Sequence, residues 1–164
     1  MNRFARVQMT LSVLGLAGWL ALSVAALRGD ALREHLALHL LGALAATLLI
    51  VLAQAWIAIY LLASERRLAP WLAGHGDLEA RLASLAPRRR LAHAAGALAL
   101  LLAAFAFVLA GRLFSGGISA RAHLATTAAS TAFLAIALVL ERRALVANED
   151  LVRRANQALT PSVE

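Results

Sequence analysis

Cysteine and lysine are both absent from this 164-residue chain. Without cysteine there is no disulfide, no thiolate metal site, no iron–sulfur cluster and no cysteine nucleophile. Charge is absent from four long stretches, residues 7–27, 35–64, 91–111 and 122–140, which contain no Asp, Glu, Lys or Arg and are 21, 30, 21 and 19 residues long. A helix needs about 20 apolar residues to cross a bilayer, so each stretch predicts one membrane span.

The composition excludes a soluble domain, because 62% of the residues are hydrophobic and the mean hydropathy is +0.75. Helices are expected because the apolar runs lack the alternation of barrel strands. The predicted fold is therefore all-α, a polytopic four-transmembrane-helix bundle that forms a single domain over residues 1–164. The expected spans are residues 7–27, 37–63, 91–112 and 121–141.

The loop at residues 64–90 is expected to contain short amphipathic helices. Leu68 and Leu72 are spaced for one helical face, and Leu78, Leu82 and Leu85 for another. Such a pair suits the surface of the inner leaflet, and a docking loop for a partner protein is the alternative. The tail at residues 142–159 keeps a helical pattern, so the fourth helix is expected to continue until near Pro161.

Arginine placement predicts the topology. The N-terminus, the loop at 64–90 and the tail hold twelve of the sixteen arginines, and the other two loops hold four. The positive-inside rule then places both termini in the cytoplasm of a bacterial inner membrane. The first span could instead be a cleaved signal peptide, with Ser23, Val24 and Ala25 as the cleavage site. Its apolar run is longer than the usual signal-peptide core, which favours a retained helix.

Small residues predict which helix faces meet, because helices in lipid pack closely where side chains are small. At 100° per residue, each span has one narrow face of small or polar residues. In the four spans these are Gly15, Gly18 and Leu22; His35, His39, Gly42, Ala46, Ala53 and Ile57; His93, Gly96, Ala97, Ala104, Phe107 and Gly111; and His123, Thr127, Ser130, Leu134 and Ala137.

Two histidines carry the main functional hypothesis. His39 and His123 lie at similar depth near the outer ends of the second and fourth spans, and they could be the two axial ligands of a haem b. Alternatively, His35 lies one turn from His39, and a three-histidine set of His35, His39 and His123 could hold a metal ion. A plain interfacial or hydrogen-bonding role for these histidines, or a proton relay, are the other interpretations.

The remaining polar and aromatic residues of the spans have simpler interpretations. Trp19, Trp56 and Tyr60 lie near span ends, where aromatic residues anchor helices at the membrane interface. Gln54, an amide deep in the second span, suits a hydrogen bond between helices.

Several functions lack the residues that they require. The uncharged stretches contain no carboxylate, which argues against a proton-coupled exporter. There is no nucleophile elbow and no glycine-rich phosphate loop. The net charge of +7 comes from arginines at span ends, which suits anionic lipid headgroups rather than nucleic acid.

A set of short motifs lies along most of the chain. They are His39, the stretch at 56–60 followed by Glu65, Arg66 and Arg67, then His123, and finally Glu141, Asn148 and Glu149. With these motifs the chain resembles uncharacterised small bacterial membrane proteins that have four spans and histidines at the starts of the second and fourth. This resemblance implies no activity.

Two functions are therefore expected. The first is a non-catalytic accessory or anchor subunit of a larger inner-membrane complex, with a respiratory complex as one candidate. Its partners would be the lipid bilayer and other membrane subunits, or further copies of the chain. The second is a redox or metal-binding membrane protein that uses His39 and His123.

Overall fold

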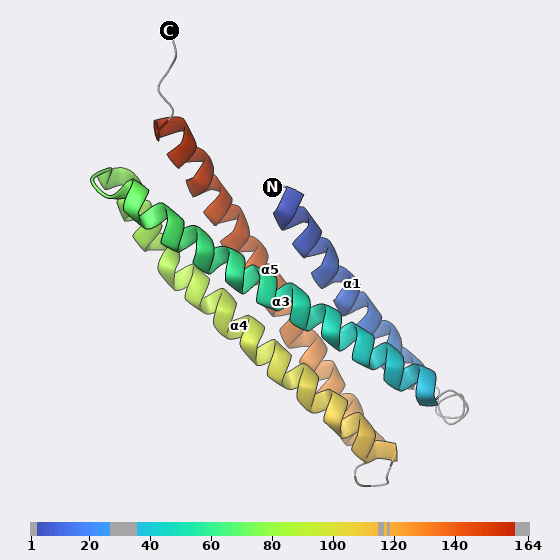
Figure 1. The fold of residues 1–164 in the computed structure, drawn as a ribbon. Coiled ribbons are helices and arrows are strands. Elements are labelled where there is room, and N and C mark those ends of the chain that lie inside the picture. The colour runs from blue at the N-terminus through green and yellow to red at the C-terminus, as the bar shows by residue number, and fades with distance from the viewer. Residues whose placement is uncertain (1–2, 27–35, 115–116, 118, 160–164) are drawn as a thin grey trace.

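The computed structural model describes residues 3–26, 36–114, 117 and 119–159 (Figure 1). These residues form four helices, α1 (Arg3–Ala26), α3 (Leu36–Leu72), α4 (Gly76–Phe114) and α5 (Ala120–Leu159), and the described part of the chain contains no strand. Each helix is long and apolar enough to cross a membrane. The predicted all-α four-helix architecture is thus confirmed. The chain is a multi-pass membrane protein whose apolar surface contacts lipid.

The helices form an antiparallel ring in chain order. α4 packs most extensively against α5, α1 packs against α3, and further contacts join α3 to α4 and α1 to α5. Figure 1 shows that the turn between α3 and α4 lies at the same end of the molecule as the start of α1 and the end of α5. This is the up-down-up-down arrangement that short connections favour.

Small residues line the interior where the helices approach one another. Trp19, Ile50 and Leu134 form the apolar core with a series of alanines, and large side chains such as Leu38, Leu101 and Val108 point outward. The outward side chains suit contact with lipid tails, and the alanines permit close helix packing. Small residues inside and large apolar side chains outside are expected when lipid rather than water surrounds the spans.

The predicted interior faces agree with the structure to different degrees. In α5 the predicted face is correct, because Thr127, Ser130, Leu134 and Ala137 are buried. In α3 the predicted alanines and Ile57 are buried as well. In the span of α4, the buried face is displaced from the predicted face by about one residue around the helix. The buried residues there are Ala92, Gly96, Ala99, Ala103, Ala106 and Ala110.

Three helices are much longer than a membrane requires. α3, α4 and α5 have 37, 39 and 40 residues, whereas α1 has 24. At 1.5 Å per residue, the long helices measure about 55–60 Å against about 30 Å of hydrocarbon. Their common end, residues 64–72, 76–90 and 142–159, is called the stem here. The stem has its own core, which contains Leu72, Leu85, Leu151 and Ala155.

The stem differs from the expected pair of surface helices. Residues 64–72 and 76–90 are helical, but they continue α3 and α4 and pack against α5. The leucine stripe of Leu68, Leu78 and Leu82 contacts the stem core instead of a leaflet. Gly74, with a φ of 85°, makes the turn between the two helices, and Pro87 lies within α4 without ending it. α5 ends at Leu159, as the sequence pattern predicts.

Candidate functional site

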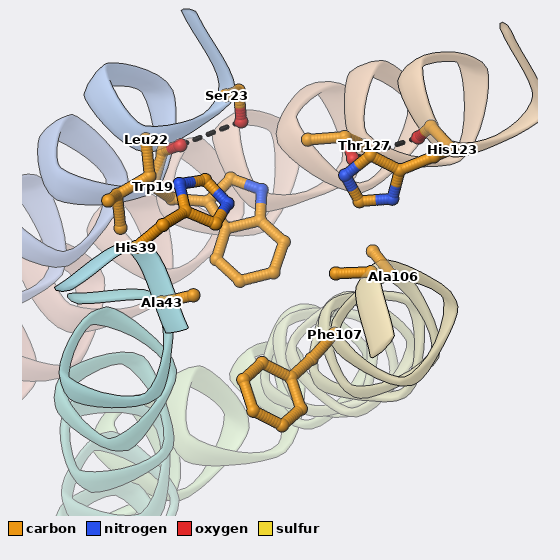
Figure 2. A pocket seen from close by; sticks show the side chains of 10 residues that line it. Trp19, Leu22, Ser23, His39, Ala43, Ala106, Phe107, His123 and Thr127 are labelled. Carbon is orange, nitrogen blue, oxygen red and sulfur yellow. Dashed lines mark hydrogen bonds between the residues drawn. The ribbon is translucent and has the colours of Figure 1, made fainter. Parts of the chain in front are cut away.

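His39 and His123 line a single pocket at the end of the bundle opposite the stem. The pocket is lined by Trp19, Leu22, Ser23, His39, Ala43, Ala106, Phe107, Ala110, His123 and Thr127. Figure 2 shows the two imidazoles and the Trp19 indole around one space, supplied by α3, α5 and α1 respectively. Each histidine lies near the start of its helix, and α3 and α5 run in the same direction. The two side chains therefore lie at the same end of the bundle.

Backbone hydrogen bonds hold the small polar residues of this histidine pocket. Ser23 Oγ donates to the Trp19 carbonyl at 2.7 Å, and Thr127 Oγ1 donates to the His123 carbonyl at 2.9 Å (Figure 2). Trp19 Nε1 and His123 Nδ1, by contrast, are buried and have no hydrogen-bond partner among the described residues. Since buried polar groups are nearly always paired, these two nitrogens mark the place where the pocket could bind a polar group.

The buried position of Trp19 corrects one prediction. The residue was expected at the membrane interface, but only 5% of its surface is exposed and it belongs to the apolar core. Trp56, with 43% of its surface exposed, is directed outward as an interfacial anchor would be. The difference arises because Trp19 follows Gly15 on the same face of α1, and this face packs against α3.

The histidine pocket is small. Its cavity measures about 30 Å³, which is room for one or two water molecules. Pockets that enclose larger organic ligands measure about 300–1,000 Å³. A haem between His39 and His123 would therefore require α3 and α5 to move apart, and haem ligation by this pair stays a prediction.

The three-histidine metal set lies partly outside the described residues, because His35 is not among them. Within the part of the chain that the structure describes, no group of three or more His, Cys, Asp or Glu side chains could hold a metal ion. Of the three histidines in this hypothesis, the structure thus brings together His39 and His123.

A second polar site lies deeper in the bundle, around Glu141. Only 1% of the Glu141 surface is exposed, and neither carboxyl oxygen has a hydrogen-bond donor at bonding distance among the described residues. Gln54 of α3 lies against this carboxyl across Gly96 of α4. A methyl group on Gly96 would lie 2.9 Å from Glu141 Oε1 and would overlap the Gln54 amide oxygen. We call Gln54, Gly96 and Glu141 the glutamate layer.

Two further polar residues face the interior from α1. Gln8 and Ser12 are one turn apart and buried, and their side-chain polar atoms have no partner in the described part of the chain. Ser12 and Gln54 line a common cavity of about 10 Å³. The interior at this level is therefore polar on α1, α3 and α5.

The glutamate layer places a carboxyl inside the bundle, one residue beyond the uncharged stretch at 122–140. Gln54 lies eleven residues before Glu65, the first charged residue that follows it in α3, which is about 16 Å along the helix axis. Glu141 ends the uncharged run of α5 in the sequence, yet its side chain points inward at the level of Gln54. The helical spacing of the sequence indicates this inward direction, since Glu141 follows Leu134 and Ala137 on the interior face of α5.

A third polar cluster holds the base of the stem together. Arg89 of α4 is 3% exposed, and its Nη2 donates to Asn148 Oδ1 of α5. Its Nη1 lies 3.2 Å from Glu65 Oε2 of α3, and Ser64 Oγ donates to Asn148 Oδ1 at 3.1 Å. One buried guanidinium thus links three helices, which is a structural role that accounts for its burial.

Comparisons of the chain with protein-family models, with curated proteins and with solved structures find no match.

Proposed function

We propose that the chain is a non-catalytic accessory or anchor subunit of a larger complex in a bacterial inner membrane, with a respiratory complex as one candidate. The observation that carries this proposal is a groove on the stem, of about 670 Å³, which we call the stem groove. It is lined by Tyr60, Val146, Glu149, Asp150, Val152, Arg153, Asn156 and Gln157.

The stem groove lies between α3 and α5. α1 packs against both α3 and α5 in the bundle, whereas the described part of α1 begins at Arg3 and the stem consists of the other three helices. The groove runs beside Tyr60 of α3 and along α5. A helix of a partner subunit would pack there, as amphipathic helices pack into grooves of other proteins.

The lining of the stem groove suits a partner helix of mixed character. Tyr60, Val146 and Val152 offer apolar surface, and Glu149, Asp150 and Arg153 offer charges of both signs. Protein interfaces commonly combine an apolar centre with a polar rim. A further copy of this chain is the other possible occupant, and the experiment below separates the two.

The orientation of the complex follows from the arginines. Most of the arginines in the described residues lie on the stem, namely Arg66, Arg67, Arg81, Arg88, Arg89, Arg90, Arg142, Arg143, Arg153 and Arg154. Arg112 and Arg121 lie at the opposite end. By the positive-inside rule, this distribution supports the proposed cytoplasmic position of the stem, at the end where α1 begins and α5 ends.

A second stem feature suits the inner leaflet. Arg88, Arg142 and Arg143 line a groove of about 910 Å³ beside the apolar side chains of Leu91 and Val139. Basic groups next to apolar surface at the cytoplasmic side match the headgroups and acyl chains of anionic lipids. This groove supports the same orientation as the arginine distribution.

Native purification in a mild detergent, followed by cross-linking and mass spectrometry, tests the proposal. We expect partner subunits to co-purify with the wild-type chain and to be lost from Val152→Arg, which places a charge in the stem groove. Ala83→Arg is the matched control, because Ala83 is an exposed stem residue that does not line the groove. Recovery of the isolated monomer alone would contradict the proposal, and recovery of an oligomer of this chain would identify a homo-oligomer.

The alternative function, a redox or metal-binding membrane protein, is favoured by one observation. His39 and His123 line the same pocket, which also contains two unpartnered nitrogens. An absorption spectrum and an elemental analysis of the purified protein test it. A Soret band that disappears in His123→Ala would support haem ligation, and absence of both haem and metal would exclude this function.

A further inference from the structure

We propose that Glu141 is a reversible proton-binding site inside the bundle, with Gln54 as its hydrogen-bond partner. This inference goes beyond the subunit function and does not depend on it. It rests on the burial of Glu141, on the neutral groups around it, and on the position of the Gln54 amide.

Burial disfavours the ionised form of the Glu141 carboxyl. Glu141 is 1% exposed, and its carboxyl oxygens accept no hydrogen bond at bonding distance from the described residues. An ionised carboxyl without a partner costs far more in an apolar interior than in water, so the group takes up a proton instead. Ionisable groups inside a membrane commonly mark proton pathways.

Among the described residues, no cation pairs with Glu141 from the helices packed around it. α1 presents Gln8 and Ser12, and α3 presents Gln54, none of which titrates near neutral pH. α4 presents Gly96, and its nearby titratable groups are His93 and Arg89. Arg89 is bound to Glu65 and Asn148, and His93 does not pair with Glu141, whose carboxyl oxygens have no partner among the described residues.

The cations of α5 itself are also directed away from this site. Arg142 and Arg143 follow Glu141 directly but are exposed and line the groove on the outer side of the stem base. Gln54, a neutral amide, is the polar side chain that lies against the Glu141 carboxyl across Gly96. The surroundings therefore favour the neutral carboxyl over the ion.

Gln54 can serve both forms of the carboxyl. Its amide oxygen accepts a hydrogen bond from the O–H of the protonated carboxyl, and its NH₂ group can donate to the carboxylate after rotation of the amide. Gly96 makes the approach possible, because any larger residue would occupy the space that the two side chains share. The glutamate layer thus keeps a proton acceptor and a hydrogen-bond partner in contact within the bundle.

A small cavity beside Gln54 extends the polar surroundings of Glu141 toward α1. Ser12 and Gln54 line this space of about 10 Å³, which is close to the volume that one water molecule requires. The Ser12 hydroxyl is buried without a partner in the described residues and can donate or accept a hydrogen bond there. Polar groups next to Glu141 thus extend from Gln54 of α3 to Ser12 of α1.

Labelling with dicyclohexylcarbodiimide tests the proposal on the full chain in detergent or vesicles. The reagent reacts with a protonated carboxyl in an apolar site: the acid proton moves to a carbodiimide nitrogen, and the carboxyl oxygen bonds to the central carbon. The resulting O-acylisourea rearranges to a stable N-acylurea. We expect mass spectrometry to locate one reagent molecule on Glu141, and the labelling to fall between about pH 5 and pH 9, a range that covers buried carboxyls.

Two variants provide the controls. Glu141→Gln is expected to abolish the labelling, and Glu65→Gln is expected to leave it unchanged, because Glu65 is half-exposed and paired with Arg89. The proposal is overturned by an unlabelled Glu141 in a folded protein or by labelling that is independent of pH. Protection by sodium ions but not by choline would also overturn it, since the site would then bind a metal cation.

Thermal unfolding across the same pH range gives a second measurement. The wild type is expected to lose stability relative to Glu141→Gln as the pH rises, because ionisation of an interior carboxyl opposes folding. Parallel curves for the two proteins would contradict the proposal even if the labelling succeeded.

Discussion

The side chains of Gln54 and Glu141 meet over Gly96, so that an amide from α3 and a carboxyl from α5 share one interior site on α4. This relationship depends on the missing side chain at residue 96. It gives the most direct test of the packing around the glutamate layer.

Replacement of Gly96 by alanine is expected to destabilise the bundle by about 1–3 kcal/mol, the usual cost of overpacking a tight interior. The added methyl group would lie 2.9 Å from Glu141 Oε1 and would overlap the Gln54 amide. Thermal unfolding in detergent measures the effect. Gly111→Ala is the control, since nothing lies within 4 Å of its added methyl group. Equal stability of the two variants would show that the side chains of the glutamate layer can shift to make room for the added methyl group.

Replacement of Asn148 by alanine is expected to loosen the stem. The change removes the acceptor that Arg89 Nη2 and Ser64 Oγ share. Loss of one partner of a buried charged donor costs about 1–3 kcal/mol. Limited proteolysis and thermal unfolding would report the loss. Gln157→Ala, an exposed change on the same helix, should remain within about 0.5 kcal/mol of the wild type.

Two replacements of Trp19 distinguish the contribution of its aromatic ring to stability from that of its N–H group. Trp19→Phe is expected to keep stability within about 1 kcal/mol of the wild type, because the lost Nε1–H has no partner in the described residues. Trp19→Ala should cost about 3–5 kcal/mol through lost packing. Trp71→Ala, at a position with 68% exposure near the stem tip, is the control. If the phenylalanine variant were as unstable as the alanine variant, Nε1 would be bonded to a group held in the histidine pocket.

Replacement of His39 by alanine is expected to leave membrane insertion intact. Insertion depends on the apolar length of the span, and His39 lies within three residues of the described start of α3. Carbonate extraction of membranes that contain the variant checks this result. Release of the variant into the soluble fraction would give His39 a structural role in the bundle.

Acid titration of the stem is expected to report on Asp150. Hydrogen bonds from Arg154 and Arg153 hold the pKa of the Asp150 carboxyl below its ordinary value of 3.8. A lowered folded-state pKa means that the ion pairs stabilise the stem above pH 3.8 and are lost as the pH falls through the lower value. NMR titration of the Asp150 carboxyl carbon measures the midpoint. Arg154→Gln should raise this midpoint toward 3.8, and an unchanged midpoint would assign the effect elsewhere.

The sequence predicts the four membrane helices and the inner face of α5 because apolar length and polar contrast are strong signals there. The inner face of α4 is harder to predict. That helix carries alanine on several sides, so Ala97 and Ala103 offer the same pattern although only Ala103 is buried. Small residues indicate close packing, but they indicate its direction poorly when they surround the helix.

The glutamate layer is hidden from sequence reasoning for a different reason. The uncharged run of the fourth span stops at Leu140, and a charged residue that follows such a run is expected to face water. The continuation of the α5 face from Ala137 to Glu141 would have placed this side chain inside the bundle. Trp19 was misplaced in a comparable way, because a tryptophan near a span end resembles an interfacial anchor until its neighbours on other helices are known.

The length of α5 links the two ends of the molecule mechanically. One unbroken helix runs from the histidine pocket past Glu141 to the tip of the stem, and α4 runs beside it for most of that distance. Glu141 lies eighteen residues from His123 and eighteen from Leu159, so the glutamate layer is about 27 Å along the helix from both the pocket and the stem tip.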